Sequence, residues 1–311
     1  MKNPFRKTVI TVRQISEAIK LLRSPNYRFL RFSPPGHFYS SIPDYDELRN
    51  RGSHFNQNVK ELPGIELREK QQLELIEKSA KFYRELPWQD NAKNSPLRYN
   101  FDNIYFSYGD VVTLYCMLRN FRPGRIIEIG SGYSSAAMLD VNELFFNDEI
   151  QFTFIEPCPD RLRSLVRDVD LNRNDLLEMP VQDTAISNFS KLEEGDFLFV
   201  DSSHVTKTGS DINHLIHHIL PHLKSGVIIH FHDILWPFEY PKKWFKAGRA
   251  WNEVYLLRAF LQFNPTFEIL FFNSFLEHHH RKRLREKLPL MLRQPLAKMT
   301  FGNSSLWLRK K

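Results

Sequence analysis

Carboxylates and imidazoles gather directly after two apolar segments of the sequence. Asp201 and His204 follow one segment, and His232 and Asp233 follow the next. If both segments are strands of an open α/β sheet, their carboxyl ends face one crevice, where such sheets bind ligands. An imidazole titrates near neutral pH and can act as a general base, while carboxylates can orient it or hold a metal ion. We therefore expect His204, Asp201 and His232 to be catalytic.

A glycine turn follows an earlier apolar segment. Arg125–Ile129 runs directly into Gly130-Ser131-Gly132, after which a helix is expected. Glycine permits a tight turn and a close approach of a ligand to the backbone, and the first turn of a helix presents free N–H groups. Glu156 ends the next expected strand, where a carboxylate can accept hydrogen bonds from both hydroxyls of a ribose. The pattern predicts a site for a nucleoside-containing cofactor.

Two further residues distinguish between the cofactors that such a turn can bind. Ser135 stands where the dinucleotide pattern has its third glycine, and Glu128 stands just before the turn. A carboxylate at this point repels the pyrophosphate of NAD but attracts the cationic amine and sulfonium of S-adenosylmethionine. The residues favour S-adenosylmethionine.

The order of an acid, a Gly-x-Gly turn and a second acid is carried by Glu128, Gly130, Gly132 and Glu156. In this order the sequence resembles the class I S-adenosylmethionine-dependent methyltransferases, over roughly residues 105–310. The resemblance implies an α/β fold with a Rossmann-like, doubly wound sheet of seven strands, the last of them antiparallel. It also implies that residues after the third strand contact adenine. The expected cofactor-binding residues are Glu128, Gly130, Ser131, Gly132, Ser135, Glu156, Gln182 and Asp183.

The polar residues after the two later segments resemble the layout of metal-dependent O-methyltransferases that act on small molecules and sugars. The resemblance implies that Asp201 and Asp233 are metal ligands and that an Asp-x-x-His pair, here Asp201 and His204, carries the base. His232 stands where those families have a carboxylate, and its nitrogen suits Mn, Fe or Zn better than Mg. A divalent metal held by Asp201, His232 and Asp233 is therefore one expected way to activate a hydroxyl, and a histidine base is the other.

Alternating strands and helices from about residue 100 onward predict the sheet that positions these residues. The expected strands are Arg125–Ile129, Gln151–Ile155, Leu177–Val181, Phe197–Asp201, Val227–Phe231, Phe267–Phe271 and Ser304–Leu308. The expected helices cover residues 66–86, 109–120, a segment from about 210 capped by Ser210 or Asp211, and 250–263.

We divide the chain into a mainly helical N-terminal extension, residues 1–100, and a methyltransferase domain, residues 101–311. The loop at residues 33–40 in the extension would suit a lid. A basic insertion is expected at about 276–300, as a solvated helix face or a phosphate or lipid contact. The aromatic, proline-containing insert at residues 235–253 is expected to form a wall or lid for the acceptor.

Composition restricts the partners and the compartment. The net charge of +7 is concentrated at the two ends of the chain, which disfavours a nucleic-acid groove. Cys116 and Cys158 form neither a metal motif nor a disulfide framework, and we find neither a secretory signal nor an apolar run long enough for a transmembrane segment. We therefore expect a cytoplasmic protein. The stripe of Ile15, Ile19 and Leu22 packs on its own domain or makes a peripheral membrane contact.

The leading interpretation is an O-methyltransferase acting on a small-molecule or saccharide acceptor, and it allows a homo-oligomer. Three alternatives stay open. One is an S-adenosylmethionine-binding partner or scaffold protein without catalysis, and another is an NAD enzyme. The third is a nucleic-acid methyltransferase, which is disfavoured because Asp201-Ser202-Ser203-His204 replaces the Asn/Asp-Pro-Pro-aromatic motif of such enzymes.

Overall fold

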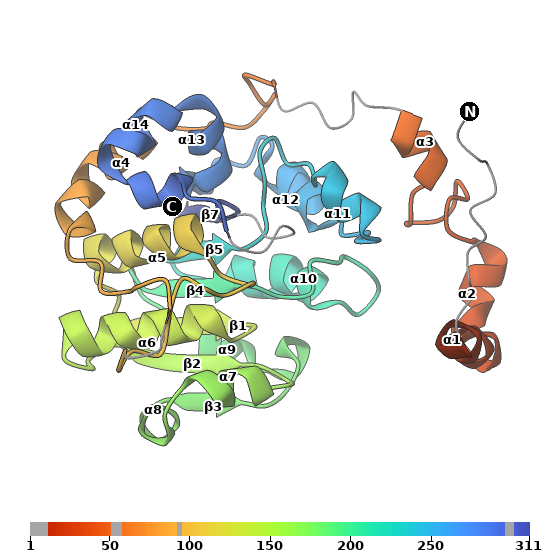
Figure 1. Cartoon of the computed structure of the whole chain (residues 1–311), viewed down its shortest axis with the longest axis horizontal. Coiled ribbons are helices and arrows are strands. Elements are labelled where there is room, and N and C mark those ends of the chain that lie inside the picture. The colour runs from red at the N-terminus through yellow and green to blue at the C-terminus, as the bar shows by residue number, and fades with distance from the viewer. Residues whose placement is uncertain (1–11, 51–57, 92–94, 296–301) are drawn as a thin grey trace. The chain divides into compact units, whose positions relative to one another are not determined.

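The computed structural model describes residues 12–50, 58–91, 95–295 and 302–311 of the chain. The chain divides into two compact units, Met1–Asn56 and Gln57–Lys311 (Figure 1). The described part of the first unit holds three helices, α1 (Val12–Arg23), α2 (Tyr27–Phe32) and α3 (Tyr45–Asn50). The amphipathic stripe expected near the N-terminus lies on α1, and its members Ile15, Ile19 and Leu22 are exposed.

One seven-stranded sheet with the order β3-β2-β1-β4-β5-β7-β6 organises the second unit. The strands β1 to β5 pair in parallel, whereas β7 lies antiparallel between β5 and β6. The expected Rossmann-like sheet with an antiparallel last strand is therefore confirmed. The strands are β1 (Arg125–Ile129), β2 (Gln151–Ile155), β3 (Asp175–Leu177), β4 (Phe197–Val200), β5 (Ile228–Phe231), β6 (Phe267–Phe272) and β7 (Leu306–Lys310).

The direction in which strands are added reverses between β1 and β4, and this switch creates the crevice in which such sheets bind ligands. The strands β4 and β5 are buried along their whole length, as the continuous apolar sequence of β4 and the mainly apolar sequence of β5, which contains His230, predict. Helices α5 (Tyr108–Phe121) and α6 (Tyr133–Phe146) contact each other and lie side by side along the sheet, and α4 (Glu69–Tyr83) packs on α5 and β6 (Figure 1).

The remaining helices connect the strands. They are α7 (Asp160–Leu165), α8 (Asp168–Arg173), α9 (Ile186–Phe189), α10 (Asp211–His214), α11 (Lys242–Lys246), α12 (Glu253–Leu261), α13 (Asn273–His279) and α14 (Arg281–Lys287). The expected cap of α10 is present, because the Ser210 hydroxyl accepts a hydrogen bond from the backbone N–H of Asn213. Among the described residues, no helix combines the length and the apolar character that a membrane crossing requires.

Two predicted strands lie elsewhere than expected. The third strand is Asp175–Leu177 and not Leu177–Val181, because Pro180 lacks the N–H for a ladder and Val181–Asp183 forms a 3₁₀ turn. The last strand begins at Leu306 and not at Ser304. The N–H and hydroxyl of Ser304 donate to the carboxylate of Asp110 instead, at 2.8 and 3.1 Å.

The basic insertion forms helices whose charges face acidic residues of α4 and of the insertion itself. His280 Nε2 lies 3.0 Å from Glu69, and Lys287 Nζ lies 2.8 Å from Glu77. Arg281, the first residue of α14, forms an ion pair with Glu277 of α13. Much of this charge run therefore forms ion pairs at the surface of the fold.

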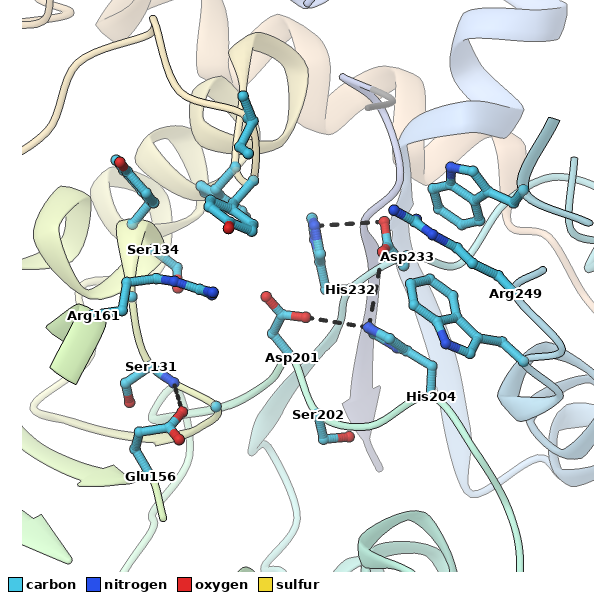
Figure 2. A pocket seen from close by; sticks show the side chains of 18 residues that line it. Ser131, Ser134, Glu156, Arg161, Asp201, Ser202, His204, His232, Asp233 and Arg249 are labelled. Atoms are coloured by element: carbon cyan, nitrogen blue, oxygen red, sulfur yellow. Dashed lines mark hydrogen bonds and ion pairs between the residues drawn. The ribbon is translucent and has the colours of Figure 1, made fainter. Parts of the chain in front are cut away.

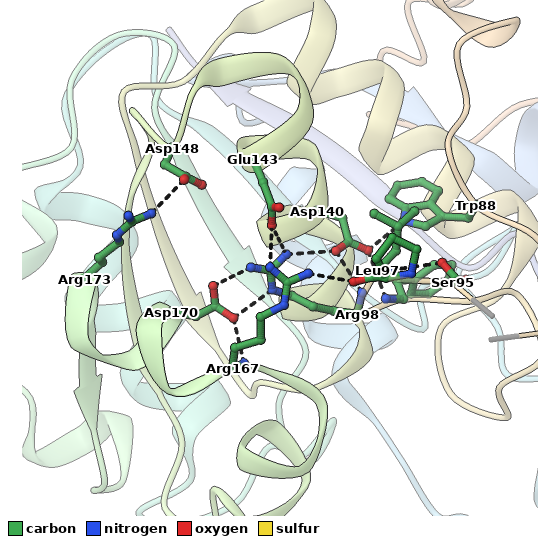
Figure 3. A network of polar contacts seen from close by, with 12 residues as sticks. Trp88, Ser95, Leu97, Arg98, Asp140, Glu143, Asp148, Arg167, Asp170 and Arg173 are labelled. Carbon is green, nitrogen blue, oxygen red and sulfur yellow. Dashed lines mark hydrogen bonds and ion pairs between the residues drawn. The ribbon is translucent and has the colours of Figure 1, made fainter. Parts of the chain in front are cut away.

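A buried cluster of charges fixes the segment that precedes α5 (Figure 3). The Arg98 side chain is 4% exposed and binds Asp170 at 2.6 Å, Glu143 at 2.6 Å and Asp140 at 3.1 Å. Burial lowers the pKa of Arg98, but the three carboxylates raise it on balance, so the guanidinium stays charged. Asp140 also accepts from the indole N–H of Trp88 at 2.9 Å. The cluster anchors the chain just before the residues that form one wall of the site.

Candidate active site

A pocket of about 320 Å³ lies beyond the carboxyl ends of β1, β4 and β5 (Figure 2). Its walls come from the glycine turn, from the ends of β4 and β5, from the segment before α5 and from the aromatic insert. The residues that line it are Ile104, Tyr105, Phe106, Gly130, Ser131, Gly132, Tyr133, Ser134, Glu156, Arg161, Asp201, Ser202, His204, His232, Asp233, Trp244, Arg249 and Trp251. The pocket therefore brings the expected cofactor turn and the expected catalytic residues together.

The turn requires glycine at its first position. Gly130 has a φ of +81°, and a Cβ built on it would lie 1.7 Å from the carbonyl oxygen of Asp201. The ends of β1 and β4 are joined here, since the backbone N–H of Asp201 donates to Ile129 at 2.9 Å. A side chain at residue 130 would push the two strand ends apart.

Glu156 lies beside this turn, half-buried in the pocket lining. Its Oε2 accepts from the backbone N–H of Ser131 at 3.0 Å, and its Oε1 accepts from that of Cys158 at 2.8 Å. Each carboxylate oxygen can accept a further hydrogen bond. The carboxylate is thus held rigidly with acceptor capacity left for a ligand.

Glu128 and Ser135 lie behind the turn and not in the pocket lining. The buried Glu128 carboxylate accepts from the hydroxyl of Ser134 at 2.5 Å and from that of Ser135. The Ser135 hydroxyl in turn accepts from the backbone N–H of Gly132 at 2.9 Å. Burial raises the pKa of Glu128 to about 8, although the serine hydroxyls lower it. These two residues support the shape of the turn from within the core.

Gln182 and Asp183 lie on the 3₁₀ turn after β3, outside the pocket lining. The Gln182 amide donates to the carbonyl of Gly209 at 2.9 Å, which ties two loops together. The Asp183 side chain is exposed. The structure thus does not bring this pair to the glycine turn.

His204 is the centre of the polar cluster (Figure 2). Its Nε2 lies 3.4 Å from Asp201 Oδ1 and 3.8 Å from Asp233 Oδ2, and its Nδ1 lies 2.8 Å from Glu253 Oε2. Burial lowers the pKa of His204, but Asp201, Glu253 and Asp233 together raise it well above the ordinary value. The pKa of Asp201 falls to about 2, because His232 and His204 outweigh the effect of burial. The cluster strongly favours an imidazolium flanked by carboxylates.

The backbone just after β4 and β5 is locally strained. His204 and Asp233 adopt φ values of +59° and +57°, a region that non-glycine residues rarely enter. The His204 carbonyl accepts from the N–H groups of Asn252 and Glu253 at 3.1 and 3.2 Å, so α12 and its preceding loop hold this conformation. Such strain persists only where the surrounding structure imposes it, and it is concentrated at functional sites.

His232 lies on the other side of the cluster and is 4% exposed. Its ring packs on Phe106 with centroids 5.2 Å apart, and its Nε2 lies 3.6 Å from Asp233 Oδ1. Within the described residues its Nδ1 is buried without a hydrogen-bond partner. Burial lowers the pKa of His232, but Asp201, Asp233 and Asp110 raise it on balance.

The expected metal ligands do not converge on a common point. Asp201 and Asp233 each lie within 4 Å of Nε2 of His204 (Figure 2). Over residues 12–50, 58–91, 95–295 and 302–311, no group of three or more His, Cys, Asp or Glu side chains has an arrangement suited to a metal ion. In this arrangement the described residues do not fit a metal ion.

Several pocket residues were not among the expected site residues. Glu253 stands in the acidic first turn of α12, and 49 positions separate it from His204, so no spacing rule links the two. Arg161 and Tyr105 stack with 4.0 Å between Cζ and the ring centroid. Trp244 and Trp251 belong to the insert that was expected to form a wall, and its aromatic content was the available signal.

The chain is similar to known proteins over the part that holds the sheet. A family model described as "Methyltransferase domain" matches residues 127–234. An uncharacterized protein of Archaeoglobus fulgidus is 37% identical over 166 residues, which cover 52% of this chain and 74% of that protein.

Solved structures with a related fold include one described as "cmcI-D160 Mg-SAM", 16% identical over 65% of this chain and 71% of that chain, with a TM-score of 0.38. A putative O-methyltransferase from Klebsiella pneumoniae is 14% identical over 76% of this chain and 89% of that chain, also with a TM-score of 0.38.

Proposed function

The chain belongs to the class I S-adenosylmethionine-dependent methyltransferases, and we propose that it methylates a hydroxyl of a small molecule or saccharide with His204 as general base. The observation that carries the proposal is the imidazole of His204, held by Glu253 on one nitrogen and facing the pocket with the other. Neither an NAD enzyme nor a nucleic-acid methyltransferase gains support from this site.

The glycine turn and Glu156 would hold the cofactor. The ribose hydroxyls are expected to donate to Glu156, whose carboxylate is already fixed by two backbone N–H groups. When bound, S-adenosylmethionine supplies a methyl group that its sulfonium has already activated. The carboxylates of Glu156 and Asp201 in the pocket lining would attract the positive charges of this cofactor.

In its neutral form, His204 then removes the proton from the acceptor. As the acceptor oxygen bonds to the methyl carbon, the carbon–sulfur bond breaks and the hydroxyl proton moves to Nε2 of His204. Glu253 accepts the N–H of Nδ1 and so leaves Nε2 as the basic nitrogen, while Asp201 and Asp233 stabilise the imidazolium that forms. The products are a methyl ether and S-adenosylhomocysteine.

The same arrangement favours the base mechanism over a metal-dependent one. Asp201 and Asp233 both lie close enough to Nε2 of His204 to stabilise an imidazolium electrostatically. Among the described residues, no group of three or more His, Cys, Asp or Glu side chains is arranged to hold a metal ion.

The proposal is tested by measuring cofactor binding and turnover separately. Calorimetry should show that S-adenosylhomocysteine binds the wild-type protein and His204→Ala with similar affinity. Turnover on a panel of hydroxylated acceptors should fall by about a hundredfold or more in His204→Ala. His217→Ala, which changes an exposed histidine outside the pocket, is the control.

Each outcome excludes a different part of the proposal. No binding heat with well-folded protein would remove the cofactor assignment. Normal turnover in His204→Ala would remove the base. Tight cofactor binding with no turnover on any acceptor would favour the alternative of a non-catalytic binding protein.

A further inference from the structure

Arg249 lines the pocket but has no part in the proposed mechanism. Its Cζ lies 4.8 Å from the ring centroid of Trp244 and 4.7 Å from that of Trp251. Figure 2 shows the side chain extending into the pocket on the side of Asp233. In the described part of the chain, the Arg249 guanidinium forms no ion pair, whereas Asp233 lies within 4 Å of both His204 and His232. A cation thus stands in the acceptor region without a carboxylate of its own.

The two indoles leave the hydrogen-bonding edge of this guanidinium available. Cation–π contacts use the flat faces of the guanidinium and of the rings, whereas the five N–H donors point outward in the guanidinium plane. Trp244 is buried, and the backbone N–H of Arg249 donates to its carbonyl at 3.1 Å, so the side chain is held at a defined position. A planar, fixed fork of this kind is suited to bind two oxygens of a carboxylate or phosphate.

Trp251 also relates Arg249 to the catalytic base. The imidazole of His204 packs on the same indole, with ring centroids 4.4 Å apart. Both the Arg249 guanidinium and the His204 imidazole therefore contact the ring of Trp251. The distance between these two groups can be no greater than their two distances to that ring added together. The other arginine of the pocket, Arg161, stacks on Tyr105 beside Gly132, on the cofactor side.

We propose that Arg249, held by Trp244 and Trp251, is an anion subsite that binds a carboxylate or phosphate group of the methyl acceptor. This inference rests on the proposed function, since it assigns the acceptor half of the same pocket. The acceptor would be an acidic molecule, such as a hydroxylated aromatic acid, a sugar acid or a sugar phosphate. Its reacting hydroxyl would contact His204 while its anionic group contacts Arg249, with Trp251 between these two side chains.

The test compares anionic and neutral probes of matched shape. Benzoate and phenyl phosphate are titrated against benzyl alcohol, with and without S-adenosylhomocysteine, and binding is followed by tryptophan fluorescence, which Trp244 and Trp251 should report. At least one anion should bind wild-type protein about tenfold or more tightly than benzyl alcohol. The stronger of the two anions identifies the acceptor group as carboxylate or phosphate.

Variants assign this preference to Arg249. Arg249→Gln should abolish the preference, and Arg249→Lys, which keeps the charge but loses the fork, should retain only part of it. Lys246→Gln removes the same charge from an exposed position on α11 and should leave the preference intact. Circular dichroism checks that each variant is folded, and Arg249→Lys replaces Arg249→Gln if the latter does not fold.

Two results would overturn the proposal. One is equal affinity of the wild-type protein for anionic and neutral probes, including no binding of either. The other is a full anion preference in Arg249→Gln, or in Arg249→Lys where Arg249→Gln does not fold. If the chain is not a methyltransferase, S-adenosylhomocysteine will not bind. The anion titration does not depend on this result, because it is also run without S-adenosylhomocysteine.

Discussion

Replacing Glu253 by Gln should change the pH dependence of methyl transfer in a defined direction. The carboxylate lies 2.8 Å from His204 Nδ1, and its side chain is 2% exposed. His204 can act as a base only when neutral, and its pKa is raised, so kcat/KM should rise with pH and reach its plateau above the ordinary histidine range. Glu253→Gln removes one of the charges that raise this pKa. The acid limb of the pH profile, in which kcat/KM rises with pH, should therefore move to lower pH.

The size of this shift follows from the geometry. At an effective dielectric constant of about 20, opposite unit charges about 4 Å apart attract by about 4 kcal/mol, which corresponds to about three pKa units. Asp201 and Asp233 still face the imidazole in the variant, and the cluster titrates as a unit. We therefore expect a shift of about one to three units. The plateau rate should also fall by about a hundredfold or more, because the amide no longer fixes the productive tautomer.

The assay measures kcat/KM from pH 5 to 10 by the formation of S-adenosylhomocysteine. Glu239→Gln serves as the matched control, since this carboxylate of the same insert accepts from the Tyr255 hydroxyl at 2.6 Å. The control should keep the wild-type limb. An unchanged limb in Glu253→Gln, or one displaced to higher pH, would show that this carboxylate does not act on the base.

Three further predictions concern stability and cofactors. Arg98→Met leaves the buried carboxylates of Asp140 and Asp170 without their cation and should cost about 3–5 kcal/mol in urea unfolding; a loss below about 1 kcal/mol would contradict the role of the cluster. The pKa of Glu128 is about 8 in the fold and near 4.5 without it, so the folded chain binds the extra proton and loses stability as pH rises from about 4.5 to 8. Glu128→Gln cannot ionise and should lack this pH-dependent loss, and parallel urea titrations at pH 5 and 8 check the difference. Turnover should persist after dialysis against a chelator, whereas loss of activity that Mg²⁺ or Mn²⁺ restores would establish a metal-dependent reaction.

The sheet and the glycine turn were predictable because their signals are local. Continuous apolar segments must be buried strands in a parallel sheet, and a strand that runs into Gly130-Ser131-Gly132 has few alternatives. Since parallel strands expose their carboxyl ends at one edge, the sequence also predicted that Asp201, His204, His232 and Asp233 gather there.

The predicted start of the last strand was wrong because a residue distant in sequence forms hydrogen bonds with it. Ser304 was expected to open the last strand, but Asp110 binds its N–H and hydroxyl, so the strand begins two residues later. Asp110 precedes Ser304 by 194 positions, and nothing in either segment shows the contact.

The sequence by itself determined the fold class, the glycine turn and the chemical types at the strand ends, because backbone propensity and burial act over a few neighbouring residues. Only the tertiary structure decided how those types are used. Glu128 faces the core and Glu156 faces the pocket, although both are acids at strand ends. His204 meets Glu253 and shares Trp251 with Arg249 because the insert after β5 folds back over β4. The direction in which a side chain points and its distance from other side chains depend on this packing. Neighbouring residues in the sequence do not determine this packing.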